Sequence, residues 1–259
     1  MTVTLKYQDQ TVTIHDGELC SYQVGGYELM HQKGSPGWGH SDTEMFPVIG
    51  PTKEANYRVQ VPKGNAIQDQ HGLLRELSYE HLYAKDTEAA FSKKYKAGTL
   101  VPNSKYPEKS TARLLIWPYD FQFKKSFRLT DSGLEVGFTV SGDKDMPYMI
   151  GYHPAFKLRT KEAEVQTESS TYTLQEIMAA GDRAVEVANT SELILKDEKQ
   201  IRLTAKGFGH FMLWSPAASM ICIEPVSFYP YEVAQPFLHE GFTYLNEKEV
   251  QFVIHIGIM

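Results

Sequence analysis

The chain shows a strong alternation of apolar and polar positions with a period of two residues. Residues 121–129 and 134–140 each place every second apolar side chain on one face. Between them, residues 130–133 (TDSG) offer turn chemistry, with a glycine that tolerates positive φ. Two such segments around a short turn predict a β-hairpin. The apolar face consists of Phe121, Phe123, Phe127, Leu129, Leu134, Val136, Phe138 and Val140.

The same alternation predicts further strands at residues 2–15, 192–205 and 250–256, whereas a helical period is hard to find. Residues 72–82 fit a short helix and equally a loop that leads into a strand. Glycines and prolines punctuate residues 31–56, which predicts a long ordered loop with short extended pieces. Residues 101–111 are polar and contain proline, which favours an irregular loop. We therefore expect one domain over residues 1–259, folded as a large antiparallel β-sandwich.

The composition limits the classes of binding partner that we expect. The net charge of −6 does not favour bulk binding to nucleic acid or to an anionic membrane. The first ten residues lack the apolar core of a signal peptide, and no apolar run is long enough to span a bilayer, so we expect a cytoplasmic protein. Cys20 and Cys222 have no zinc-site spacing and are expected to be reduced thiols. A small molecule is the expected partner, and both a monomer and a homodimer remain open.

His153 is the first candidate for chemistry. Read as one strand, residues 148–153 place Met149, Gly151 and His153 on the same face, and Gly151 would leave room beside the histidine for a ligand. Pro154 would end the strand directly after it. The alternative is a core histidine with a single hydrogen bond.

Glu224 is the second candidate. In residues 220–225 (MICIEP), Cys222 and Glu224 face one way, and Ile221 and Ile223 face the other. A carboxylate at the end of an apolar strand has a raised pKa and becomes a better proton acceptor near neutral pH. The alternative is a structural salt bridge.

Two further segments could line a site. In residues 70–75 (QHGLLR), His71 lies beside a glycine, and Arg75 could donate hydrogen bonds to hydroxyls or phosphate. Residues 45–53 form a loop that ends at Lys53. The other seven histidines show no metal-ligand spacing, and no phosphate loop or dinucleotide fingerprint is present. We therefore expect neither a metal nor a cofactor. Trp38, Trp117 and Trp214 are expected in the core, although they could stack on a sugar.

Together, these segments resemble the aldose 1-epimerase family, and in particular its bacterial branch of LacX-like proteins. The likeness runs from about residue 10 to the C-terminus. The segments that carry it, in order along the chain, are FPVIG (46–50), QHGLLRE (70–76), MPYMIGYHPAF (146–156) and ICIEPVSFYP (221–230).

The resemblance implies a β-supersandwich that interconverts the α and β anomers of an aldose, or of an aldose 6-phosphate, without a cofactor. His153 would be the general acid that protonates the ring oxygen, and Glu224 the general base at the C1 hydroxyl. His71 would bind a sugar hydroxyl. We also expect Arg75, Lys53 and Tyr152 to contact the substrate. Such an acid–base pair fits ring opening on chemical grounds alone, because one group must give a proton while another takes one.

One position departs from the family pattern. Relatives commonly carry an arginine after the FPxxG loop, where this chain has Pro51; Arg75, Lys53 or Arg58 are possible substitutes. Two alternatives therefore stay open. The first is a non-catalytic sugar-binding or sensing protein on the same fold. The second is a hydrolase or lyase, which would need a second carboxylate, with Asp69 or Glu76 as the candidates.

Overall fold

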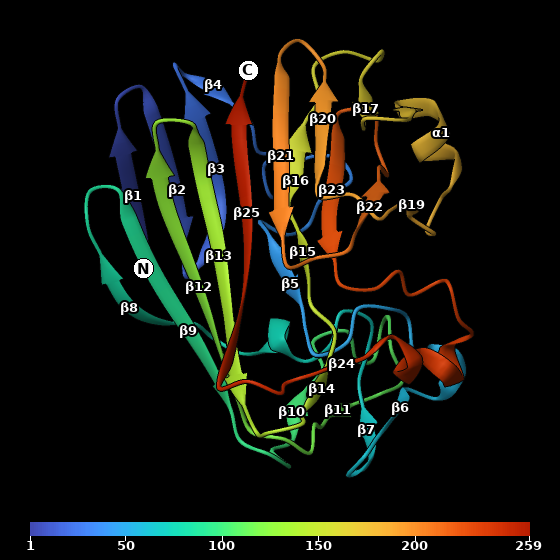
Figure 1. Ribbon diagram of the computed structural model, residues 1–259. Coiled ribbons are helices and arrows are strands. Elements are labelled where there is room, and N and C mark those ends of the chain that lie inside the picture. The colour runs from blue at the N-terminus through green and yellow to red at the C-terminus, as the bar shows by residue number, and fades with distance from the viewer.

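The computed structural model describes residues 1–259, and its main elements are antiparallel sheets (Figure 1). The strands of the largest sheet are β8 (Glu80–Ala84), β9 (Glu88–Tyr95), β12 (Phe121–Thr130), β13 (Gly133–Gly142), β17 (Glu164–Gln166), β18 (Thr171–Thr173), β20 (Glu192–Lys196), β21 (Gln200–Lys206) and β25 (Glu249–Ile258). Their spatial order is β18-β17-β20-β21-β25-β13-β12-β9-β8.

A second sheet carries most of the segments singled out by sequence. Its strands are β5 (Thr43–Met45), β15 (Gly151–His153), β16 (Ala155–Lys157), β19 (Val185–Ala188), β22 (His210–Trp214) and β23 (Met220–Val226). Their order is β19-β22-β23-β15-β5, and β16 also pairs with β23. A third sheet is a meander of β1 (Thr2–Tyr7), β2 (Gln10–His15), β3 (Glu18–Val24) and β4 (Tyr27–Glu28).

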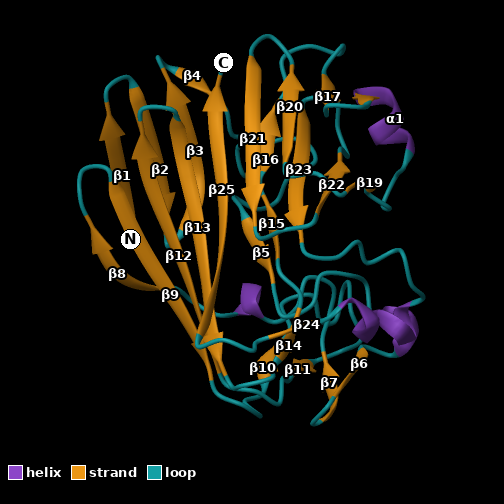
Figure 2. Ribbon diagram, viewed as in Figure 1, coloured by secondary structure: helices purple, strands orange, loops and turns teal.

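Short elements gather at the end of the molecule opposite the C-terminus, where loops are most abundant (Figure 2). The strand pairs there are β6 (Arg58–Val61) with β7 (Gly64–Ile67), β10 (Val101–Pro102) with β11 (Leu114–Leu115), and β14 (Pro147–Tyr148) with β24 (Thr243–Tyr244). The helices are α1 (Leu174–Ala179) and the 3₁₀ helices η1 (Lys53–Ala55), η2 (Leu74–Glu76) and η3 (Gln235–Gly241). No helix combines the length and the apolar composition that crossing a bilayer requires.

The all-β prediction is confirmed, and the period-two pattern explains why. In the predicted hairpin β12–β13, all eight apolar residues of the predicted face are buried. The predicted strands at the N-terminus, at residues 192–205 and at the C-terminus are also present. Residues 72–82 contain the one-turn helix η2 followed by strand β8, so the alternative of a loop leading into a strand is closer to the structure.

The three large sheets share one hydrophobic core. A single cluster of 62 buried residues draws side chains from all of them. Phe138 of β13 packs on Tyr152 of β15, with 5.1 Å between ring centroids, which joins the first sheet to the second. Gln10 of β2 donates a hydrogen bond of 2.7 Å to the carbonyl of Thr130 in β12, which joins the first sheet to the third. That the chain is one domain stays a prediction.

Candidate functional site

The second sheet brings His153 and Glu224 together. Strand β15 pairs with β23 through Gly151 and Val226, and it pairs with β5 through His153 and Thr43. His153 Nε2 lies 3.4 Å from Glu224 Oε1, although the two residues are far apart in sequence. Their exposed fractions are only 7% and 2%. Strand pairing therefore places an imidazole and a carboxyl group side by side in a buried position.

Gly151 has a different role from the one expected. A Cβ at this position would lie 2.6 Å from Met45 Cε and 3.0 Å from Val226 Cγ1. The space beside His153 on its own strand is therefore filled by packed side chains and is not open to a ligand. The glycine is needed because the neighbouring strands approach closely here. Pro154 ends strand β15, as expected, but it interrupts the pairing with β23 only briefly, because β16 begins at the next residue.

Burial sets the protonation of the pair. It lowers the pKa of His153 to about 3, and the positive charge of Arg75 adds to this shift. Burial also raises the pKa of Glu224 well above its usual range. Burial thus favours a neutral imidazole beside a protonated carboxyl group over an ion pair of imidazolium and carboxylate, and in either form one proton can move between the two groups.

His71 faces His153 across the site, with 5.5 Å between ring centroids and an interplanar angle of 83°. Its Nδ1 lies 3.0 Å from the carbonyl oxygen of Ile49. Because a carbonyl only accepts, Nδ1 carries the proton and Nε2 is left as an acceptor. Burial lowers the pKa of His71 well below its usual range, so the ring stays neutral.

Gly72 fixes the position of His71. Both residues have positive φ, 75° for His71 and 72° for Gly72. A Cβ on Gly72 would lie 2.2 Å from the carbonyl oxygen of Phe46, so only glycine fits without movement of the backbone. The FPVIG and QHG segments thus touch each other, which is why both belong to one site.

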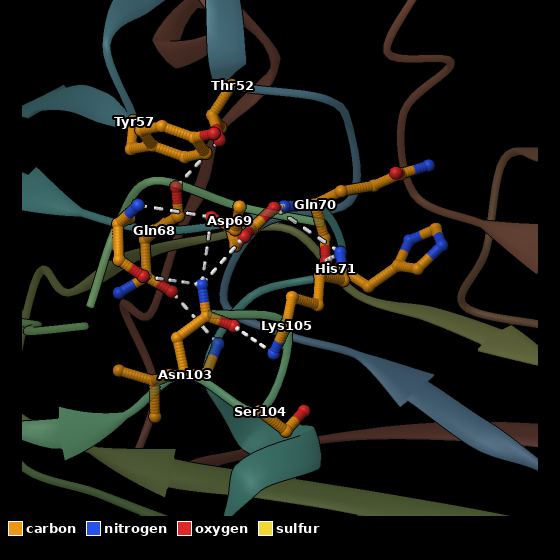
Figure 3. A network of polar contacts seen from close by, with 12 residues as sticks. Thr52, Tyr57, Gln68, Asp69, Gln70, His71, Asn103, Ser104 and Lys105 are labelled. Carbon is orange, nitrogen blue, oxygen red and sulfur yellow. Dashed lines mark hydrogen bonds and ion pairs between the residues drawn. The ribbon is translucent and has the colours of Figure 1, made fainter. Parts of the chain in front are cut away.

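A hydrogen-bond network centred on Asp69 holds a second loop against His71 (Figure 3). Asn103 Nδ2 donates to Asp69 Oδ2 at 2.8 Å, and Lys105 Nζ lies 3.3 Å from Asp69 Oδ1. Lys105 Nζ also donates to the carbonyl of Gln70 at 3.1 Å. Figure 3 shows the His71 ring projecting away from these contacts. The network therefore places Lys105 beside the site and makes no contact with the imidazole, whose Nε2 is left as an acceptor.

His71, Lys105, His153 and Glu224 line a cleft of about 770 Å³. This volume lies within the range of roughly 300–1,000 Å³ typical of small-molecule sites. Aromatic rings flank His153: the ring of Trp38 lies 5.2 Å away and that of Trp214 lies 6.0 Å away, centroid to centroid. Both tryptophans line the cleft, whereas Trp117 is in the core, as expected. The charged residues that line the cleft are Glu54, Arg75, Lys105, Lys109, Asp182, Arg183 and Glu224.

Two of the expected substrate-binding residues do not line the cleft. Tyr152 is fully buried on the opposite face of β15 from His153, and its hydroxyl donates to Asp42 Oδ2 at 2.7 Å. The alternation of side chains along a strand makes this placement unavoidable. Lys53 in η1 and Arg58 on β6 are exposed and do not line the cleft, whereas Arg75 does line it.

Tyr152 belongs to a buried charged cluster beneath the site. Lys125 Nζ lies 2.6 Å from Asp42 Oδ2 and 2.5 Å from Glu44 Oε1. Burial raises the pKa of Asp42 to about 6, with neighbouring Glu44 adding to the rise. Burial also opposes ionisation of Glu44, but Lys125 and Lys93 outweigh it and lower its pKa. This cluster ties β12 to β5 and β15, which carry Thr43 and His153 of the cleft.

The same geometry bears on hydrolysis and on metal binding. The candidate second carboxylates for hydrolysis, Asp69 and Glu76, do not line the cleft; Glu76 instead accepts from Ser104 Oγ at 2.9 Å. His153, Cys222 and Glu224 have potential ligand atoms within 4.8 Å of one another and could hold a metal ion. Burial raises the pKa of the Cys222 thiol well above its usual range, so a metal ion would have to displace the thiol proton in order to bind the sulfur.

The fold is an antiparallel β-sandwich with one cleft of small-molecule size, and sequence comparison identifies the family. Residues 54–234 match the family model described as aldose 1-epimerase, so the chain belongs to the aldose 1-epimerase family. The plasmid-encoded protein LacX of Lactococcus lactis subsp. lactis is 27% identical over 173 residues, covering 63% of this chain and 53% of LacX. The chain thus spans about half the length of the curated relatives that it matches.

Solved structures with low sequence identity share the fold. A galactose mutarotase-like protein from Lactobacillus casei ATCC 334 is 19% identical, with a TM-score of 0.82 and complete coverage of both chains. A galactose mutarotase related enzyme from Lactobacillus acidophilus is 20% identical, with a TM-score of 0.77 and coverage of 99% of this chain and 97% of that one. The galactose mutarotase-like β-sandwich predicted from the sequence is therefore confirmed.

Proposed function

We propose that this protein is a mutarotase that interconverts the α and β anomers of an aldose or an aldose 6-phosphate by acid–base ring opening, without a cofactor. The observation that carries the proposal is the 3.4 Å contact between His153 Nε2 and Glu224 Oε1 inside the cleft. Membership of the aldose 1-epimerase family supports a carbohydrate epimerase in general. The residue roles and the substrate are part of the proposal.

The reaction needs one proton given and one taken. His153 protonates the ring oxygen, and Glu224 accepts the proton of the C1 hydroxyl. The bond between C1 and the ring oxygen breaks, and the aldehyde forms. After rotation about C1–C2, the ring closes on the other face, and both protons return. The pair therefore ends each cycle with the single proton with which it began.

The burial of the pair suits the open-chain sugar. Once the ring has opened, Glu224 is protonated and His153 is neutral, which is the state that burial favours for both groups. The site thus stabilises the high-energy open form relative to the cyclic substrate. Favouring the species along the reaction path over the bound ground state is what accelerates a reaction.

Neighbouring groups are suited to hold the sugar. The unprotonated Nε2 of His71 can accept a hydrogen bond from a hydroxyl, and the Arg75 guanidinium can donate to others. The rings of Trp38 and Trp214 offer flat apolar surfaces beside His153. Pro51 lines the cleft but has no hydrogen-bond donor. We therefore assign to Arg75 the sugar-binding role that the arginine after the FPxxG loop has in relatives.

Anomer exchange measured by NMR tests the proposal. We expect the wild type to accelerate exchange of at least one sugar in a panel of free aldoses and aldose 6-phosphates. We expect Glu224→Gln to reduce the rate by about 10²–10⁴-fold, the usual contribution of an acid–base group. A folded wild type that binds a sugar without accelerating exchange would instead indicate a sugar-binding or sensing protein.

A further inference from the structure

Cys222 lies beside the acid–base pair but takes no part in the proposed anomer exchange. It is fully buried and shares one face of β23 with Glu224, because alternate residues of a strand point the same way. The potential ligand atoms of His153, Cys222 and Glu224 all lie within 4.8 Å of one another. These atoms are an imidazole nitrogen, a sulfur and a carboxyl oxygen, which are the three kinds of side-chain atom that bind zinc.

The spacing of the three atoms is close to that of a zinc site. Bonds of about 2.0–2.3 Å in a tetrahedral arrangement place the ligand atoms roughly 3.3–3.8 Å apart. His153 Nε2 and Glu224 Oε1, at 3.4 Å, already meet this condition. A separation of 4.8 Å has to close by about 1 Å, which small rotations of the side chains can provide. His153 Nδ1 is also buried without a hydrogen-bond partner, so the ring has a second nitrogen that no protein group occupies.

The surroundings leave one position of such a site open. His153 and Glu224 line the cleft, whereas Cys222 does not. Cys222 packs instead with Trp38 and Trp214, whose rings also border His153. An ion held by the three side chains would therefore meet the cleft on one side only. Three protein ligands with water in the fourth position are the usual arrangement of a zinc site that is open to solvent.

The charges balance when a divalent ion binds. Coordination needs a neutral imidazole, a carboxylate and a thiolate, so the thiol proton and the proton shared by His153 and Glu224 leave to solvent. The two negative charges that result offset the two positive charges of the ion. Buried charges that coordinate a metal ion avoid the cost of an unpaired charge.

We propose that His153, Cys222 and Glu224 form a binding site for Zn²⁺, and that the bound ion blocks anomer exchange. Thiolate and imidazole ligands suit zinc, whereas Mg²⁺ and Ca²⁺ prefer sites made of oxygen atoms. The bound ion occupies the lone pairs through which His153 and Glu224 move protons, so neither can act on the sugar. The blocking effect rests on the proposed function, whereas the metal site itself does not.

The absorption spectrum of bound Co²⁺ tests the ligands directly. Co²⁺ can take the place of Zn²⁺, and a thiolate ligand gives it a charge-transfer band in the near ultraviolet. The chain has only two cysteines, so Cys20→Ser is the matched control. We expect one Co²⁺ per chain, with the band present in the wild type and in Cys20→Ser and absent from Cys222→Ser.

The result does not depend on the folding of Cys222→Ser. Cys20→Ser leaves Cys222 as the only thiol, so the band in that variant identifies the ligand by itself. Loss of the band in Cys20→Ser would overturn the site, as would saturation with Co²⁺ without any band.

Calorimetry of Zn²⁺ binding measures the contribution of the sulfur. Loss of an outer-shell partner lowers metal affinity by about 10–100-fold, so we expect Cys222→Ser, which loses a ligand, to bind Zn²⁺ at least about 100-fold more weakly. Cys20→Ser should bind Zn²⁺ like the wild type. Equal affinity in Cys222→Ser and the wild type, or displacement of Zn²⁺ by an equal concentration of Mg²⁺, would refute the assignment.

Exchange rates separate the metal site from the proposed function. Without metal, the wild type, Cys20→Ser and Cys222→Ser should exchange anomers at similar rates. Zn²⁺ should stop exchange in the first two, a chelator should restore it, and Cys222→Ser should need at least about 100-fold more Zn²⁺.

Each failure has its own pattern. Zn²⁺ binding by a protein that exchanges no sugar would leave the metal site and remove the mutarotase. Exchange by a protein that binds no Zn²⁺ would leave the mutarotase and remove the metal site. Exchange that continues unchanged, or becomes faster, with Zn²⁺ bound would overturn the blocking effect.

Discussion

Replacing Lys125 with methionine tests the charged cluster beneath the cleft. Lys125 is fully buried and lies within hydrogen-bonding distance of both Asp42 and Glu44. Methionine keeps most of the side-chain volume but removes the charge. Two buried carboxyl groups then lose their main partner. Glu44 keeps Lys93 at 3.8 Å, and Asp42 keeps only neutral donors such as the Tyr152 hydroxyl.

The expected cost follows from the burial of the cluster. Removing one partner of a buried charge pair destabilises a protein by about 3–5 kcal/mol. In a chain of this size each kcal/mol shifts the melting temperature by roughly 2–4 °C, so we expect a fall of roughly 6–20 °C. Because Asp42 and Glu44 flank Thr43 of the cleft, we also expect weaker sugar binding.

Urea unfolding at pH 7.5 and a thermal melt provide the assay. Lys124→Met is the matched control, because Lys124 precedes Lys125 on β12, points to the other face and forms no ion pair. Adding Asp42→Asn and Glu44→Gln to Lys125→Met should restore part of the stability, since no charge is then left unpaired. A loss below about 1 kcal/mol, as for an exposed pair, would refute the reasoning.

Three further predictions concern the site. Glu224→Gln should raise the melting temperature at pH 8. The pKa of Glu224 is raised in the folded state, so the carboxyl group ionises first in the unfolded state, and the stability of the wild type falls as pH rises, by about 1.4 kcal/mol for each unit by which the folded pKa exceeds the unfolded one. An unchanged or lower melting temperature contradicts this. For kcat/KM of anomer exchange, we expect no loss on acidification from pH 7 to about 5, because the pKa of His153 is about 3, and a fall as pH rises through the raised pKa of Glu224; a loss of activity on acidification through pH 6.5 contradicts it. Gly72→Ala should reduce both stability and activity, because its Cβ meets the Phe46 carbonyl, whereas Gly64→Ala, with positive φ but open space, should reduce stability alone; equal effects in the melt and exchange assays contradict this.

The fold was predictable where the period of two was regular. Strands β12 and β13 alternate along their whole length, so their buried faces could be read directly from the sequence. The same register places Lys125 on the buried face, a signal of the charged cluster that the apolar pattern alone did not reveal. Helix α1 was missed because its six residues are too few to establish a period, although Thr173 and Glu176 form a capping box.

The site was predictable only in part. Motifs pointed to His153, Glu224, His71 and Arg75, and the structure brings all four to one cleft. Tyr152 was misplaced even though it is adjacent to His153, because neighbouring residues of a strand face opposite sides. Lys105 and Lys109 come from a loop whose path depends on contacts distant in sequence, such as that between Asn103 and Asp69, so no local pattern indicated them. Trp38 was considered for sugar stacking, but composition alone favoured a core position.

The central claim is that His153 and Glu224 act as one unit in anomer exchange. The most direct test is the exchange rate of the wild type, His153→Asn, Glu224→Gln and the double variant, measured by NMR on the best substrate. Groups that act together are strongly non-additive. The account predicts that each single variant falls nearly to the level of the double variant. Losses that simply add, or a Glu224→Gln protein that retains the wild-type rate, would contradict it.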